Sequence, residues 1–158
     1  MSLRELDGVK DPKAARALEL INKTNQFNTT GKRWTEQEFA AAFKAGKRIY
    51  VFDVKDNFTA YGTVGVVVVH EGEVEQFVMS CRTAGLDVEI AAMAQITREM
   101  AARGHAALSA AFTETDLNLL CRDFYKRCGF ESKGGRWERP AEPALEQPAH
   151  IKMVDKLS

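Results

Sequence analysis

The sequence lacks long hydrophobic runs, any excess of charge of one sign, and a secretory signal. Its longest strongly apolar run, residues 64–69, is interrupted by Gly65 and is far shorter than the roughly 20 residues that cross a bilayer. The 22 basic and 22 acidic side chains cancel, so no overall field attracts a polyanion. The first eight residues contain no apolar core of the kind a signal peptide needs. We therefore expect a cytoplasmic protein without nucleic-acid or membrane partners.

Cysteine and histidine are also scarce. The three cysteines, Cys81, Cys121 and Cys128, form an odd count without a CxxC pair, which argues against a disulfide framework and against a structural zinc site. The three histidines are far apart and show no metal-ligand spacing. We expect reduced thiols and no bound metal.

Proline is rare until the end of the chain, where Pro140, Pro143 and Pro148 fall close together. A chain of 158 residues is long enough for one domain with a full core and too short for two of ordinary size. We expect one domain over residues 1–140. Residues 141–158 are expected to form a proline-rich tail that is extended or loosely docked.

Hydrophobic periodicity predicts a mixed α/β (α+β) domain with the order α-α-β-β-β-α-β-α-β. Thr35 and Glu38 match a capping box at the start of the second helix. The strands rich in Val, Tyr and Ile on either side of Asp56 and Asn57 predict an antiparallel hairpin. The expected helices cover residues 12–21, 36–45, 88–102 and 117–128, and the expected strands cover 48–54, 61–69, 73–80, 106–112 and 137–139.

The turn from the third strand into the third helix, residues 81–87, is suited to bind phosphate, because a helix N-terminus presents free N–H groups and a positive dipole end. Within it, Arg82-x-x-Gly85 matches the pyrophosphate-loop pattern of the GCN5-related N-acetyltransferase (GNAT) superfamily. Asn118 and the run from Phe124 to Phe130 resemble the second motif of that superfamily. The resemblance implies a mostly antiparallel central sheet flanked by helices.

A narrower resemblance covers almost the whole chain to about residue 139. The runs 22–28, 79–82 and 88–89, with Phe124-Tyr125 and Gly129-Phe130, are similar to the C-terminal acetyltransferase-like domain of FkbH-like proteins. In that family the domain usually follows a haloacid-dehalogenase-like domain that loads acyl groups onto acyl carrier proteins. The chain has no Asp-x-Asp-x-Thr/Val motif of such a domain, so a longer parent chain or a partner would have to supply it.

The GNAT resemblance implies a thioester ligand, either acetyl-CoA or the phosphopantetheine arm of a carrier protein, and an acyl acceptor that is small or carrier-bound. Tyr125 would protonate the leaving thiolate, and backbone N–H groups near Met79 and Cys81 would polarise the thioester. The residues implied in cofactor binding are Met79, Cys81, Arg82, Thr83, Ala84, Gly85, Leu86, Asp87 and Asn118.

Several of these side chains also fit a purely structural role. Tyr125 also fits the edge of an apolar helix face, and Asn118 fits a role in bonding nearby backbone groups. Cys81 borders the loop, where a helix dipole lowers a thiol pKa, yet no histidine near it in sequence activates it, which favours a packed thiol. Cys121 and Cys128 are expected in the core.

The acceptor is expected near the amide-rich segment after the first helix, with Lys23, Thr24, Asn25 and Gln26 as the substrate-binding candidates. The alternative is that the Asn and Thr side chains of this segment bond their own backbone. The general base stays open between Glu75, Asp53 and His70.

Asp87 departs from the GNAT pattern, which has a small residue there. A carboxylate repels a diphosphate at close range, although Asp at a helix start also caps the helix. This favours a carrier-protein pantetheine over free CoA. Three interpretations follow: an acyltransferase, a non-catalytic module that docks a pantetheinylated carrier protein, and an interaction domain whose cleft is lost.

Overall fold

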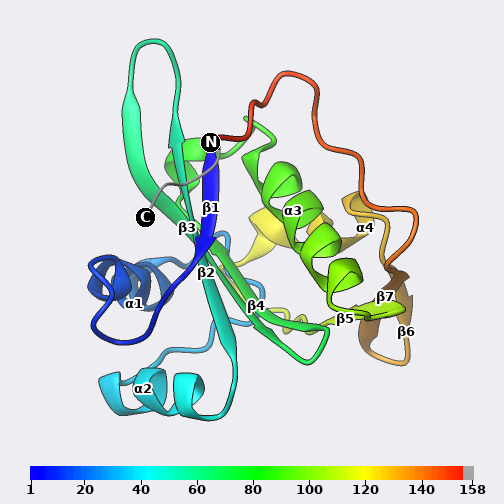
Figure 1. Cartoon of the computed structure of the whole chain (residues 1–158), viewed down its shortest axis with the longest axis horizontal. Helices are drawn as coiled ribbons and strands as arrows, with labels where there is room; N and C mark the ends of the chain where they lie inside the picture. The colour runs from blue at the N-terminus through cyan, green and yellow to red at the C-terminus, as the bar shows by residue number, and fades with distance from the viewer. Residues whose placement is uncertain (155–158) are drawn as a thin grey trace.

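The computed structural model describes residues 1–154 and contains one seven-stranded sheet in the order β1-β2-β3-β4-β5-β7-β6 (Figure 1). All neighbouring strands are antiparallel except the parallel pair β4 and β5. The mixed, mostly antiparallel sheet predicted from the sequence is confirmed. The strands are β1 (Ser2–Glu5), β2 (Arg48–Lys55), β3 (Ala60–His70), β4 (Glu73–Met79), β5 (Ala107–Ala110), β6 (Glu131–Lys133) and β7 (Arg136–Pro140).

Helices cover both faces of the sheet. The helical elements are α1 (Ala14–Lys23), α2 (Glu36–Lys44), α3 (Val88–Ala102) and α4 (Phe124–Arg127), with the 3-10 turns η1 (Cys81–Thr83) and η2 (Leu119–Cys121). Figure 1 shows α1 and α2 on one side of the central strands and α3 and α4 on the other. Alternate residues of β2 point to opposite faces, since Ile49 and Val51 belong to one core cluster while Tyr50 and Phe52 belong to the other.

The predicted hairpin and the third helix are confirmed: β2 and β3 pair antiparallel, and α3 has the predicted bounds. The capping box at α2 is also present, because Thr35 accepts from the Glu38 N–H and Glu38 accepts from the Thr35 N–H, each at 3.0 Å. Gly65 of β3 lies against the ring of Phe52, and an added Cβ would come within 1.9 Å of that ring. Only glycine fits this position without displacing Phe52.

The expected helix over residues 117–128 is wrong in extent, because the chain forms η2 and the short α4 instead. The apolar residues at helical spacing in 117–128 predicted one buried helix face, yet Leu117 and Leu120 are 60% and 42% exposed. Cys121 and Cys128 are buried as expected. Strands β1 and β6 were not predicted, because their short sequences carry no apolar alternation.

The chain after β7 forms neither helix nor strand as far as residue 154. In Figure 1 this segment (orange to red) passes alongside α3 and returns to the N-terminus. Arg139 donates to the Pro143 carbonyl at 2.6 Å, and the Val154 N–H donates to the Met1 carbonyl at 2.8 Å. Residues 155–158 of the expected tail lie outside the described residues.

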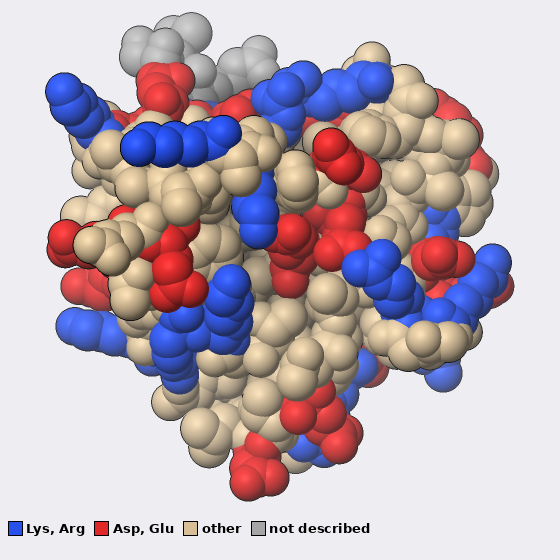
Figure 2. All heavy atoms as spheres, turned by 90° about the horizontal axis from the view of Figure 1, so that it is seen from below, with Lys and Arg blue, Asp and Glu red and all other residues tan. Residues whose placement is uncertain are grey.

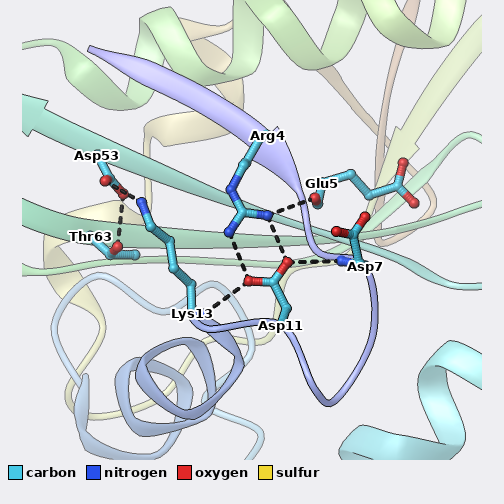
Figure 3. Close-up of polar contacts among 7 residues, drawn as sticks. All are labelled: Arg4, Glu5, Asp7, Asp11, Lys13, Asp53 and Thr63. Carbon is cyan, nitrogen blue, oxygen red and sulfur yellow. Dashed lines mark hydrogen bonds and ion pairs between the residues drawn. The ribbon is translucent and has the colours of Figure 1, made fainter. Parts of the chain in front are cut away.

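A polar network joins β1, the start of α1 and the β2–β3 pair (Figure 3). Arg4 donates two hydrogen bonds to Asp11, each at 2.7 Å, and Asp11 also accepts from the Asp7 and Lys13 N–H groups. The hydrogen bonds from Arg4 hold the pKa of Asp11 well below its usual range. This network fixes the entry into α1 on the sheet.

Acidic and basic side chains are interspersed over the face drawn in Figure 2, without a large area of one sign. No helix within residues 1–154 has the length and apolar character needed to span a bilayer.

Candidate functional site

The candidate site lies where β4 and β5 diverge. These parallel strands pair only at Glu73 with Ser109 and at Val74 with Ala110. Just beyond this point the register between β3 and β4 shifts, so that Glu75 is left between two ladder pairs as a bulge. The rest of β4 therefore presents an edge that β5 does not cover.

Residues 27–29, called the inserted segment below, occupy this edge. The Met79 N–H donates to the Phe27 carbonyl at 2.9 Å, and the Thr29 N–H donates to the Phe77 carbonyl at 3.1 Å. The Phe77 N–H donates to the Thr29 hydroxyl at 2.9 Å. On the other side, the Thr113 N–H donates to the Thr29 carbonyl at 2.9 Å. The inserted segment thus fills the gap between β4 and the chain that follows β5.

Buried amides hold the inserted segment in place. The Asn28 side chain donates to the Thr24 carbonyl at 3.1 Å and accepts from the Gly31 N–H and the Gln76 amide, each at 2.9 Å. Gln76 in turn accepts from the Trp34 indole at 2.7 Å. Because Asn28 and Gln76 are almost fully buried, losing any of these partners leaves a buried polar group unsatisfied.

Asn118 belongs to the same network. Its side-chain amide donates to the Asn28 carbonyl at 3.0 Å and to the Thr113 carbonyl at 2.8 Å, and its oxygen accepts from the Thr115 N–H at 2.9 Å. The side chain is fully buried. Of the two roles expected for Asn118, its contacts are those of the backbone-bonding one.

The residues at this edge do not fit acetyl-CoA in the arrangement described. The Met79 N–H, which the resemblance implies in thioester binding, already donates to Phe27, and the Ser80 N–H donates to the Val64 carbonyl. A pantetheine amide has no free donor to pair with at Phe77 or Met79 while the inserted segment is in place.

The loop implied in phosphate binding is folded into local turns. The N–H groups of Arg82, Thr83, Ala84 and Leu86 donate to atoms of Ser80, Cys81 and Thr83. Gly85 has φ +85° and open space where a Cβ would stand, so a ligand can approach its backbone. Cys81 and Arg82 are exposed, so the expectation of a packed Cys81 thiol is wrong, whereas Thr83 is buried.

Carboxylates lie at the N-terminus of α3. Asp87 adopts a left-handed conformation, φ +62°, and makes no capping hydrogen bond, so the expected cap is wrong. Its carboxylate instead lies 3.4 Å from Arg127, which also donates to the nearly buried Glu89 at 3.0 Å. The carboxylates of Asp87 and Glu89 therefore already place negative charge at the N-terminus of α3, and Arg127 partly compensates it.

Tyr125 is buried in α4 rather than exposed in a cleft. Its side chain is 1% exposed, and rings of Phe112, Phe124 and Phe130 surround it. The hydroxyl has no hydrogen-bond partner within residues 1–154. Burial raises the pKa of Tyr125, and the Thr29 side chain beside it offsets part of that rise. Its role as general acid stays a prediction.

The four acceptor-side candidates form one mostly exposed stretch at the end of α1. Lys23, Asn25 and Gln26 are exposed, and Thr24 is half-buried. Gln26 lines a shallow groove of about 650 Å³ whose floor is formed by exposed leucines of the segment around η2. These four residues stay predictions as substrate contacts.

The structure separates the three candidates for the general base. Glu75 binds Lys47 at 2.7 Å, and its other oxygen lies 4.0 Å from His70. Asp53 lies near the C-terminal end of β2, away from Glu75, where it contacts Lys13 and accepts from the Thr63 hydroxyl (Figure 3). Only Glu75 and His70 lie together near the bulge of β4.

Sequence reasoning missed the inserted segment and its anchor Gln76. The signal that points to them is the amide-rich run 22–28, which contains the apolar Phe27 inside an otherwise polar connector. Within residues 1–154 no cluster of His, Cys, Asp or Glu has the composition to hold a metal ion.

Sequence comparison with protein-family models and with curated proteins finds no match. Comparison with solved structures does. A Streptococcus mutans protein superposes with a TM-score of 0.65 at 15% identity, covering 90% of this chain and 100% of its own. A GCN5-related N-acetyltransferase from Rhodopseudomonas palustris gives 0.58 at 15% identity, covering 87% and 94%.

A third structure is a GNAT-superfamily phosphinothricin acetyltransferase from Sinorhizobium meliloti in complex with acetyl-CoA. It superposes with a TM-score of 0.55 at 16% identity, and each chain covers 94% of the other. Identities this low establish the fold and leave function to the site. The chain has the fold of the GNAT acetyltransferases.

Proposed function

We propose that this protein is a non-catalytic module of the GNAT fold that docks an acyl carrier protein. The observation that carries the proposal is the occupied edge of β4, where the Met79 and Phe77 N–H groups donate to the inserted segment. The FkbH-like resemblance supports the choice of partner. The acyl-loading chemistry would then belong to a haloacid-dehalogenase-like domain in the cytoplasm, on a longer chain or a separate one.

A docking surface is available beside η2. Leu117 and Leu119 are 60% and 69% exposed, and with Leu120 they form the floor of the groove that Gln26 borders. Exposed leucines gathered in this way supply apolar contact area for a partner. Arg122 and Asp123 also line this groove, and Arg122 is paired with Glu114 at 3.4 Å, so the exposed leucines rather than charge carry the docking argument.

The experiment compares carrier protein with and without its phosphopantetheine arm. Because the arm has no open edge on β4 to pair with, both forms should bind with the same affinity in isothermal titration calorimetry. Leu119→Glu should weaken binding at least tenfold. Val9→Glu, at another exposed apolar residue (52%), should leave it unchanged. Binding that requires the arm would contradict the proposal.

A second candidate function, acyl transfer from a thioester to an acceptor, is favoured by one observation. The Tyr125 hydroxyl is buried without a hydrogen-bond partner in the described part of the chain, and a native protein keeps such a group only where something offsets its cost. The resemblance gives that hydroxyl the role of general acid. Thermal melts with acetyl-CoA separate the candidates, since a docking module shows no saturable shift at millimolar ligand.

A further inference from the structure

The inserted segment lies on β4 in the manner of an extended ligand. It exchanges backbone hydrogen bonds with Phe77 and Met79 on one side and receives one from Thr113 on the other. Phe27 anchors one end, with its ring 5.8 Å from that of Phe77 and 5.1 Å from that of Phe124. A chain paired on both sides in this way completes the sheet at the point where β5 leaves it.

The Thr29 hydroxyl accepts a hydrogen bond that a bound ligand on this edge would otherwise accept. It receives the Phe77 N–H at 2.9 Å, the first donor on this edge beyond the bulge at Glu75. A ligand carbonyl that paired with β4 at Phe77 would need the same N–H, so it could not bind there together with the Thr29 hydroxyl.

Asp87 is a weaker obstacle than the sequence indicates. Its side chain is 46% exposed and lies 3.4 Å from Arg127, so much of its field is screened by solvent and by the guanidinium. The backbone at Gly85 is open. The acidic loop residue by itself leaves room for a phosphate group, whereas the inserted segment leaves none for a pantetheine.

We propose that residues 27–29 act as an internal occupant of the acyl-pantetheine position on β4, and that this segment, rather than Asp87, is what excludes CoA from the fold. The inference rests on the proposed function, in which free CoA is not a ligand. It adds that the β4 edge is a latent thioester site, closed by Asn28 and Gln76.

The test uses one double variant and two single variants of the whole chain in thermal melts and calorimetric titrations with acetyl-CoA. Gln76→Met removes the amide that holds Asn28 while keeping the side-chain volume, and Thr29→Ala frees the Phe77 N–H. The double variant should bind acetyl-CoA with a saturable rise in Tm. Asp87→Gly, the residue type the GNAT pattern prefers, should not. Thr97→Ala, at an equally buried threonine whose hydroxyl bonds within α3, is the matched control and should not bind either.

The outcomes separate this inference from the proposed function. Binding by the unaltered protein overturns both. Binding by Asp87→Gly alone overturns only the inference, and so does a folded double variant that stays inert. Hydrogen exchange on the unaltered protein covers the case in which the double variant does not fold. The Phe77 and Met79 amide protons should then exchange as slowly as those paired between β3 and β4. Fast exchange at both would contradict the pairing of residues 27–29 with β4.

Discussion

At the scale of single residues, a few buried polar groups decide how the chain enters its first helix and how its candidate site is closed. Asp11 and Asn28 each collect hydrogen bonds from several parts of the chain. Such residues specify one arrangement, because every alternative leaves several buried groups without partners. Two predictions belong to this scale.

Replacing Asp11 by Asn should lower the free energy of unfolding at neutral pH by about 1.5 to 3 kcal/mol, the usual range for a hydrogen bond to a charged group. The pKa of Asp11 is depressed by Arg4, so its contribution is present above the unfolded pKa of about 3.9 and is lost as pH falls below it. Urea unfolding from pH 7 to pH 2 measures this. The gap between the two proteins should narrow in acid, and a constant gap would contradict the assignment.

Replacing Tyr125 by Phe should leave stability unchanged or raise it by up to about 1 kcal/mol, because removing an unpaired buried hydroxyl removes a desolvation cost. The hydroxyl has no partner in the described residues. Urea denaturation with matched m-values checks this. A loss of more than about 1 kcal/mol would mean that the hydroxyl is bonded in solution, with Thr29 the nearest candidate.

At the scale of elements, β3 and β4 carry the features that shape the site. Gly65 allows the ring of Phe52 to cross over β3, and the bulge at Glu75 separates the paired part of β4 from the part that receives the inserted segment. Both are places where the ladder is irregular, and irregular ladders redirect edges and side chains.

Gly65→Ala should destabilise the protein by about 3 kcal/mol, at the upper end of the usual cost of overpacking. The added Cβ would stand 1.9 Å from the Phe52 ring. Phe52→Val in the Gly65→Ala background should recover part of the loss, because it removes the atoms in conflict. Thermal melts of the single and double variants measure the coupling, and strictly additive losses would refute the contact as the cause.

At the scale of the whole molecule, the chain after β7 ties distant parts together. It packs along α3, reaches the loop at Leu86 through His150 at 3.1 Å, and bonds the N-terminal residue. The two layers of helices and this returning segment enclose the sheet on both faces. The segment therefore contributes to stability although it forms no regular element.

Ile151→Ala should lower stability by about 1 kcal/mol, less than a fully buried site would cost. Ile151 is partly buried against the core beneath α3. Val9→Ala, at a residue that is 52% exposed, should change stability by less than about 0.5 kcal/mol. Equal effects of the two substitutions in urea denaturation would show that the segment is undocked in solution.

The sequence by itself determined the elements whose signals are local. The capping residues Thr35 and Glu38, the hairpin around Asp56 and the period of α3 depend on neighbours within a few positions, and each was predicted correctly. The sheet type followed from their order. The GNAT fold was predicted from the Arg82-x-x-Gly85 loop and the motif around Tyr125, and the structural comparison confirms that fold.

Only the tertiary structure decided how the site is filled. The Thr29 hydroxyl accepts from the Phe77 N–H, 48 positions away along the chain. The Asn118 amide donates to the Asn28 carbonyl, 90 positions away. Neither contact produces a hydrophobic periodicity that could be detected in the sequence. In place of the helix expected over 117–128 the chain forms η2 and α4, and Asn118 just before η2 bonds the inserted segment. Long-range hydrogen bonds between buried amides depend on the whole fold, and in this chain they hold residues 27–29 against the edge of β4.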